Sequence, residues 1–228
     1  MTWANPKRAH LYSALFNAQL PAAPNDRTMG EIHVKILCDS FGWEYSDELV
    51  HMSIALSPEN EQYADGYFRQ FNDAKTVLIN TTAGNDKREM TQETVEELIE
   101  LLLKFYPNMH ILLNVAPAET HKFSALCELF PENVHILPYS SDVLNFCALV
   151  KKCSTVISPD TAVVHIASAF EIPIVGIFNN SVRHAKQWGP QHRKSVVVMS
   201  THQDDLRIVT SEQIFRGFQQ LNNNYQIV

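Results

Sequence analysis

The feature that most constrains the fold is a regular alternation of short apolar runs with amphipathic stretches between Lys75 and Leu221. The apolar runs have the composition of buried strands and lie at 77–80, 111–115, 134–137, 155–158, 174–178 and 195–199. Apolar residues three and four apart predict helices at 91–106, 121–130, 142–152, 161–170 and 211–221. This alternation predicts an α/β domain whose mostly parallel sheet carries helices on both faces.

The segment before this alternation is less regular. Helices are predicted over 29–41, which Gly42 would end, and over 57–71, which opens with a Ser-Pro-Glu start. A weak alternation over 51–56 favours a strand. We therefore expect a ligand-binding domain over 28–228.

Residues 1–27 are unusual for the start of a domain, because they hold three prolines and a short amphipathic stretch, Leu11–Phe16. We interpret them as a linker or the remnant of a missing amino-terminal domain. Leu11, Leu15 and Phe16 would form an association patch if they face water, which predicts a homodimer or a companion chain.

The composition excludes several classes of protein. The 228 residues carry a net charge of −7 without a basic stripe, so we expect no nucleic-acid partner. The four cysteines show no CxxC spacing and predict buried, reduced thiols in a cytoplasmic protein. We find no signal peptide and no apolar run near the ~18 residues of a membrane span.

The stretch 154–178 is a compact strand–helix–strand pattern, and its turn carries the chemistry. Asp160 is predicted to be the N-cap of the helix. A helix N-terminus offers unpaired N–H groups and a partial positive charge at the carboxyl end of a strand. Thr161 and the N–H groups of Ala162 and Val163 are therefore predicted to face an anion.

His165 lies four residues after Thr161, on the same helix face, and is in reach of the same ligand. The alternative is a capped helix with a satisfied histidine and no ligand. Ser211 is predicted to cap the last helix in the same way as Asp160 caps this one.

A polar loop with two hydroxyls and a cationic pair follows the run at 77–80. Thr81 and Thr82 are predicted to hold phosphate oxygens, and Lys87 or Arg88 to neutralise their charge. The alternative is an ordinary solvated loop.

Two further strand ends carry candidate binding groups. Glu119 follows the run at 111–115 and is predicted to accept from ribose hydroxyls, with a helix-start acid as the alternative. Tyr139 and Ser140 follow the run at 134–137 and offer an edge for a base, although Tyr139 is equally consistent with a surface aromatic.

Several familiar motifs are missing from the sequence. There is no GxGxxG and no GxxxxGK[ST], which argues against a dinucleotide oxidoreductase and a P-loop protein. No GxSxG elbow and no spacing typical of metal ligands is present, so we expect no bound metal. The acidic pair Asp204 and Asp205 is predicted to face water.

Together these residues resemble the carboxyl-terminal half of the lipopolysaccharide heptosyltransferases, glycosyltransferase family 9. The segment 160–169 is similar to the family's Asp-Thr-Gly-x-x-His-x-x-x-Ala block, which holds the donor's diphosphate. The loop 81–88 is similar to its second phosphate loop, Glu119 to its ribose-binding acid, and Leu137-Pro138 to the pair before its adenine contact.

The resemblance implies a Rossmann-like domain that forms one half of a GT-B arrangement. It implies an ADP-activated sugar such as ADP-heptose as donor, no cofactor, and inverting, metal-independent transfer to a lipopolysaccharide or glycan acceptor. It also implies a cytoplasmic protein with at most peripheral contact at the inner face of the bacterial inner membrane.

The sequence departs from the family pattern in several places. Ala162 replaces the usual Gly, Glu89-Met90 replaces Trp-Pro, and Asn179-Asn180 follows the strand where a Gly is usual. The amino-terminal domain, which supplies the acceptor site and the carboxylate base, is missing. We therefore assign no catalytic base and expect no unaided transfer. The alternative function is a non-catalytic nucleotide-binding or assembly module that needs a partner chain.

Overall fold

The computed structural model describes residues 2–3, 19–20, 27–203 and 205–227, which fall into two compact units. The first unit comprises residues 1–52 and 182–188, and the second comprises residues 53–181 and 189–228. The predicted ligand-binding domain starts at residue 28, whereas the second unit begins at Ser53.

The first unit contains two short parallel strands and a longer helix. Strand β1 (Thr2–Trp3) pairs with β2 (Gln19–Leu20), and helix α2 spans Met29–Phe41. Gly42 ends α2 with a φ of 69°, as predicted. Helix α8 (Val182–Trp188) also belongs to this unit and was not predicted.

The proposed association patch at Leu11, Leu15 and Phe16 lies outside the described residues. The prediction of a homodimer or a companion chain therefore stays a prediction.

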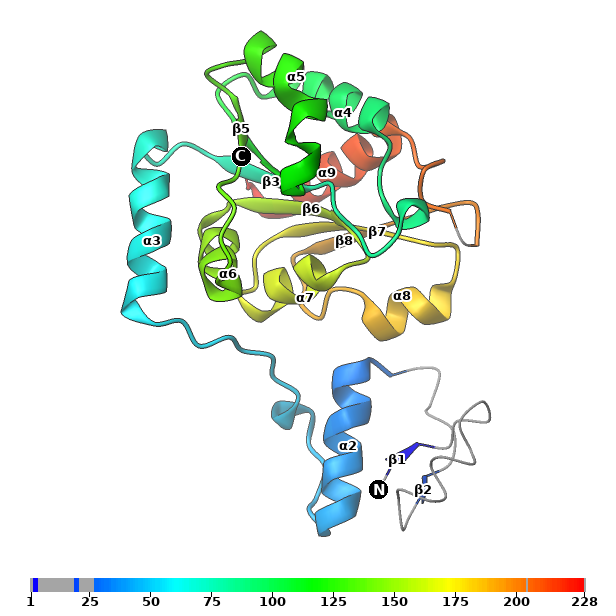
Figure 1. Ribbon diagram of the computed structural model, residues 1–228. Coiled ribbons are helices and arrows are strands. Elements are labelled where there is room, and N and C mark those ends of the chain that lie inside the picture. The colour runs from blue at the N-terminus through cyan, green and yellow to red at the C-terminus, as the bar shows by residue number, and fades with distance from the viewer. Residues whose placement is uncertain (1, 4–18, 21–26, 204, 228) are drawn as a thin grey trace. The chain divides into compact units, whose positions relative to one another are not determined.

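The second unit is built on a parallel six-stranded sheet (Figure 1). Its strands are β3 (Thr76–Asn80), β4 (His110–Asn114), β5 (Val134–Ile136), β6 (Thr155–Pro159), β7 (Ile174–Phe178) and β8 (Ser195–Met199). Every strand of this sheet was predicted from its apolar composition, with bounds within one residue of those observed. The fold is therefore the Rossmann-like α/β class that the sequence indicates.

The strand order is β5-β4-β3-β6-β7-β8. The chain starts in the middle at β3, moves outward to β5, and then returns to place β6 beside β3, with Val77 opposite Thr155. The direction of winding reverses between β3 and β6. Loops that leave the carboxyl ends of these two strands turn to opposite faces, which opens a crevice where ligands bind in such folds.

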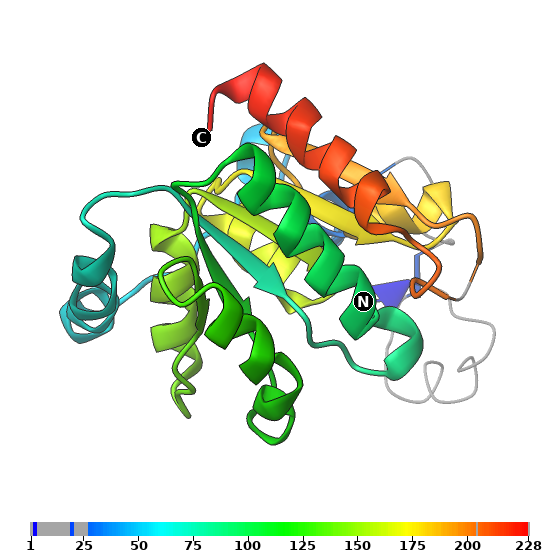
Figure 2. The same cartoon turned by 90° about the horizontal axis from the view of Figure 1, so that it is seen from above.

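Helices cover both faces of the sheet. Helices α4 (Gln92–Phe105) and α9 (Ser211–Tyr225) lie side by side on one face, where Figures 1 and 2 show them crossing the strands. Helices α6 (Val143–Lys152) and α7 (Ala162–Ala169) cover the other face, and α3 (Pro58–Phe68) packs against α6. The predicted apolar face of α4 is fully buried: Val95, Leu98, Ile99 and Leu102.

Two local predictions are wrong, and a third, the helix over 121–130, is only partly confirmed. Residues 51–57 form no strand. The helix predicted over 121–130 is a 3₁₀ stretch, Pro117–Phe123, followed by the short helix α5 (Ser124–Leu129). The N-cap of α9 is Thr210 rather than Ser211, because the Thr210 hydroxyl accepts from the N–H of Gln213 and Ser211 is already helical.

Candidate functional site

A cavity of about 370 Å³ lies at the carboxyl edge of the sheet, within the second unit. Loops that follow β3, β6, β7 and β8 contribute its walls. The lining residues are Asn85, Asp86, Lys87, Arg88, Asp160, Asn179 and Leu206. The cavity therefore includes the switch point between β3 and β6, and it brings together two segments that the sequence assigned to phosphate binding.

The first of these segments is the start of α7. Thr161 is its N-cap, since its Oγ1 accepts from the N–H of Val163 at 3.3 Å. The prediction of Asp160 as N-cap is wrong, because the cap is Thr161. Asp160 lies between the end of β6 and this cap, and its backbone N–H donates to the carbonyl of Ile177. The N–H of Val163, which was predicted to face an anion, is occupied by the cap, and Ala162 is exposed.

Asp160 instead forms an ion pair across the switch point. Its Oδ2 lies 3.1 Å from Arg88 Nη2, and its side chain is 12% exposed. An opposite charge at this distance compensates the cost of burying the carboxylate. The pair joins the loop after β3 to the start of α7, so the charge of Arg88 is already balanced within the protein.

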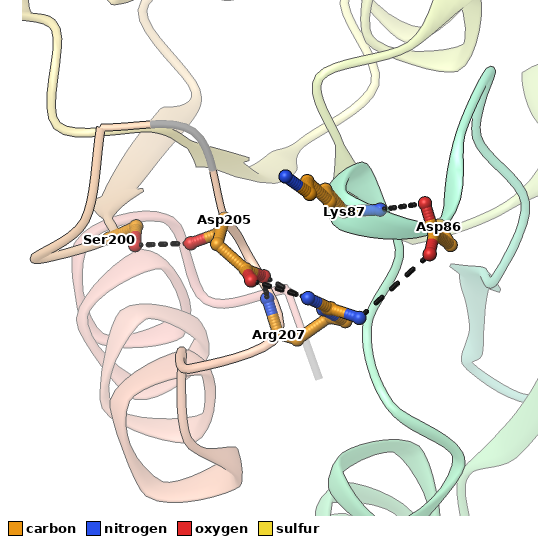
Figure 3. Close-up of polar contacts among 5 residues, drawn as sticks. All are labelled: Asp86, Lys87, Ser200, Asp205 and Arg207. Atoms are coloured by element: carbon orange, nitrogen blue, oxygen red, sulfur yellow. Dashed lines mark hydrogen bonds and ion pairs between the residues drawn. The ribbon is translucent and has the colours of Figure 1, made fainter.

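Lys87 is placed differently from Arg88. Its backbone N–H donates to Asp86 Oδ1 at 3.0 Å within the 3₁₀ turn Asp86–Arg88, while its side chain extends away from that carboxylate (Figure 3). No hydrogen bond or ion pair of the Lys87 ammonium is found among the residues that the structure describes. Lys87 therefore brings an uncompensated positive charge to the wall of the cavity.

The two threonines of this loop turn into the protein. Thr81 Oγ1 donates to the carbonyl of Asn114 at 2.9 Å, and Thr82 Oγ1 donates to Asn80 Oδ1 at 3.0 Å. Neither residue lines the cavity. In this geometry their hydroxyls fasten the loop to the sheet, and a phosphate contact would require them to exchange partners.

Asn80, at the end of β3, connects the candidate phosphate-binding segments and was not predicted from the sequence to do so. Its side chain is fully buried, and its Nδ2 lies 3.0 Å from the carbonyl of Thr82 and 3.1 Å from each of Ser158 Oγ and Thr161 Oγ1. Its Oδ1 accepts from Asn114 Nδ2 at 2.7 Å. One amide thus connects three neighbouring strands with the N-cap of α7. The signal in the sequence was a polar residue that closes an otherwise apolar run.

The three candidate base and ribose contacts lie near the ends of β4 and β5, and none of them lines the cavity. Glu119 sits in the 3₁₀ stretch after β4 and pairs with Lys122. Tyr139 is 75% exposed. Ser140 Oγ accepts from the N–H of Asp142 and from Asn145 Nδ2, so it supports the start of α6.

His165 projects from α7 and is partly buried. Burial lowers the pKa of its imidazole, and the nearby charge of Asp160 opposes that shift. His165 therefore lies close enough to Asp160 to feel its charge, but it does not line the cavity.

Asp205 does not simply face water as predicted, and Asp204 lies outside the described residues. The Asp205 carboxylate accepts hydrogen bonds from Arg207 Nε at 2.9 Å and from Arg207 Nη2 at 2.6 Å (Figure 3). These side-chain hydrogen bonds from Arg207 lower the pKa of Asp205 to about 2. The prediction failed because the partner lies only two residues away on a loop, where no periodic pattern reveals it.

Comparison with known proteins identifies a protein family whose profile matches most of this chain. The sequence profile of glycosyltransferase family 9 (heptosyltransferase) matches residues 2–215. A curated relative, the lipopolysaccharide core heptosyltransferase OpsX of Haemophilus influenzae, is 26% identical over 139 residues, which cover 58% of this chain and 38% of the relative. The chain thus spans somewhat more than a third of the length of the curated relatives that it matches.

Solved structures of similar fold include two heptosyltransferases from Escherichia coli. ADP-heptose lipopolysaccharide heptosyltransferase II superposes with a TM-score of 0.75 at 14% identity, covering 99% of this chain and 70% of the other. Heptosyltransferase WaaC, in a structure with ADP, superposes with a TM-score of 0.70 at 17% identity, covering 94% and 62%. At these identities the likeness shows the fold alone, which is the Rossmann-like α/β fold described above.

No helix that the structure describes combines the length and the apolar character required to traverse a lipid bilayer.

Proposed function

Because this chain belongs to glycosyltransferase family 9, we propose that its second unit binds the donor of a sugar transfer reaction. In this proposal the donor is ADP-heptose or a similar ADP-activated sugar, and the acceptor is a lipopolysaccharide or another glycan. The acceptor hydroxyl attacks the anomeric carbon, the nucleoside diphosphate leaves, and the configuration inverts without a metal ion. The names of the relatives support the donor and acceptor classes.

The observation that carries the proposal is the cavity at the switch point with Lys87 on its wall. Negative charge grows on the diphosphate as its bond to the sugar breaks. A preorganised cation and a helix N-terminus stabilise that charge where they are aimed at it. Lys87 supplies the cation, and the partial positive charge at the start of α7, which follows the cavity residue Asp160, adds to its effect on the leaving group.

Arg88 and Asp160 have a supporting role in this proposal. Their ion pair of 3.1 Å holds the two phosphate-binding segments together and adds no net charge. The adenosine extends along the carboxyl edge of the sheet towards β4 and β5. There Glu119 accepts from the ribose after giving up part of its contact with Lys122, and Tyr139 stacks on the base.

Isothermal calorimetry with ADP, UDP and an ADP-sugar tests the proposal on the purified chain. ADP and the ADP-sugar are expected to bind more tightly than UDP. A charge-assisted hydrogen bond contributes about 1.5–3 kcal/mol, so Lys87→Ala is expected to weaken ADP binding roughly 10- to 150-fold. Asp160→Ala is expected to weaken it as well, because Arg88 and the start of α7 lose their link.

Lys75→Ala is the matched control, since Lys75 is an exposed lysine directly before β3, at the opposite end of the same strand. It is expected to bind ADP as the unsubstituted chain does. The proposal fails if the unsubstituted chain binds no ADP at millimolar concentration, or if Lys87→Ala and Lys75→Ala bind it equally well.

A further inference from the structure

The loop after β8 holds the turn that carries Lys87 (Figure 3). The N–H of Leu206 donates to the carbonyl oxygen of Lys87 at 2.8 Å. Arg207 Nη1 lies 3.9 Å from Asp86 Oδ2, a loose ion pair to the same turn. We refer to residues 205–207 as the clasp. It contacts the Lys87 turn through the backbone on one side and through a charged side chain on the other.

The clasp is itself well fixed. Asp205 Oδ1 accepts from the backbone N–H of Arg207 at 3.0 Å, in addition to the two contacts with the guanidinium. Ser200 Oγ donates to the carbonyl of Asp205 at 2.7 Å, which ties the clasp to the end of β8. Leu206 is 3% exposed. A bidentate carboxylate–guanidinium pair fixes geometry as well as charge, so Arg207 is held in one direction.

The turn that the clasp contacts is the one whose geometry matters for an anion. The Asp86 carboxylate accepts a hydrogen bond from the N–H of Lys87 and forms the loose ion pair with Arg207. The same carboxylate therefore connects the clasp to Lys87, the residue that faces the cavity. A lysine side chain has many rotamers, and the backbone from which it starts decides which of them reach the cavity. Fixing the turn therefore restricts where the Lys87 ammonium can go.

We propose that Arg207, held by Asp205, is a positioning residue for the nucleotide donor, because it fixes the Asp86–Arg88 turn so that Lys87 faces the cavity. This inference rests on the proposed function. A competing role for Arg207 is simple attraction of the anionic donor by its charge. The two roles make opposite predictions for the loss of the Asp205 carboxylate. If Arg207 is a positioning residue, the loss leaves its guanidinium unheld and weakens ADP binding. If Arg207 acts by its charge, the loss makes the region more positive and strengthens ADP binding.

The test measures ADP affinity by calorimetry in four variants of the full chain, with Lys87→Ala as the reference for the double variant and a further variant as the control. Arg207→Ala and Asp205→Ala are each expected to weaken ADP binding by roughly 5- to 20-fold, a part of the effect of removing the Lys87 ammonium itself. Arg207→Lys keeps the charge but not the planar fork, and is expected to restore only part of the affinity. The double variant Lys87→Ala with Arg207→Ala is expected to bind no more weakly than Lys87→Ala alone. Arg216→Ala, at an exposed arginine of α9, is the control.

The outcomes separate the possibilities. Tighter ADP binding by Asp205→Ala, or full affinity in Arg207→Lys, would show attraction by charge and overturn the positioning role. Additive losses in the double variant would overturn it too, because Arg207 would then act independently of Lys87. If the unsubstituted chain binds no ADP, the proposed function fails and this inference fails with it. If it binds ADP and Arg207→Ala binds equally well, only the inference fails.

Discussion

Replacement of Asn80 by alanine tests how the switch point is held together. The side chain is completely buried and meets three acceptors through Nδ2 and two donor side chains through Oδ1. The amide nitrogen has only two hydrogens, so it can donate full hydrogen bonds to only two of the three acceptors at a time. We therefore count two bonds donated and two accepted.

The expected magnitude follows from these bonds. Each neutral hydrogen bond contributes about 0.5–1.5 kcal/mol net, and a buried partner left unsatisfied costs about 1–3 kcal/mol. Some partners keep other bonds, since Ser158 Oγ also donates to the carbonyl of Pro159 at 2.8 Å. We expect Asn80→Ala to lower the free energy of unfolding by about 2–4 kcal/mol. ADP binding should weaken as well, because Thr82 and Thr161 lose an anchor they share.

Urea unfolding followed by circular dichroism measures the stability, and calorimetry measures the ADP affinity. Asn85→Ala is the control for the stability measurement only, because Asn85 is exposed on the adjacent loop and its side chain makes no cap hydrogen bond, whereas its place on the cavity wall makes it unsuitable as a control for ADP binding. Its effect on unfolding should stay within about 0.5 kcal/mol. If Asn80→Ala is as stable as Asn85→Ala, the amide does not hold the switch point. If stability falls but ADP affinity does not, the amide holds the fold and has no part in the site.

Two further predictions concern protonation. Burial lowers the pKa of three histidines below the ordinary value of about 6.5: His135, His165 and His192. The unfolded chain then binds more protons than the folded one, so the free energy of unfolding should fall as the pH drops from 7 to 5. His135→Gln should make this dependence on pH less steep. A free energy of unfolding that rises on acidification would contradict the prediction. Cys127 is a partly exposed thiol, and three others are buried: Cys38, Cys147 and Cys153. Burial raises the pKa of Cys127, so a disulfide reagent at pH 8 should label it slowly but before the others; mass spectrometry that finds Cys147 or Cys153 modified first in the folded chain would refute this burial pattern.

The local elements of the second unit could be predicted because their signals are local. A buried parallel strand is a short apolar run, and the amphipathic helix α4 repeats its apolar residues every three to four positions. Cap predictions were less secure, since Asp160 and Thr161 are both good cap residues and only the backbone direction at the end of β6 selects Thr161. The error of one residue changed the role of Asp160 from a cap to the partner of Arg88.

The candidate site was predicted in part. Lys87 and Asp160, which directly precedes the N-cap of α7, do line one cavity, because loops at the carboxyl ends of parallel strands share one edge of the sheet. The direction of each side chain was not predictable. Thr81 and Thr82 bond inward to Asn114 and Asn80, and these are choices among partners that the sequence does not rank.

By itself, the sequence determined the strands of the sheet, most of the helices that cover it and the family that they resemble, because those properties reside in periodicity and in a contiguous block of residues. The tertiary structure alone decided that β6 returns beside β3, so that Asn80 meets Ser158 and Thr161 across about 80 positions of chain. It also decided that the 205–207 clasp reaches the Lys87 turn. Such contacts depend on strand order and on the paths of loops, and these are fixed by packing of the whole sheet and its helices rather than by any local pattern.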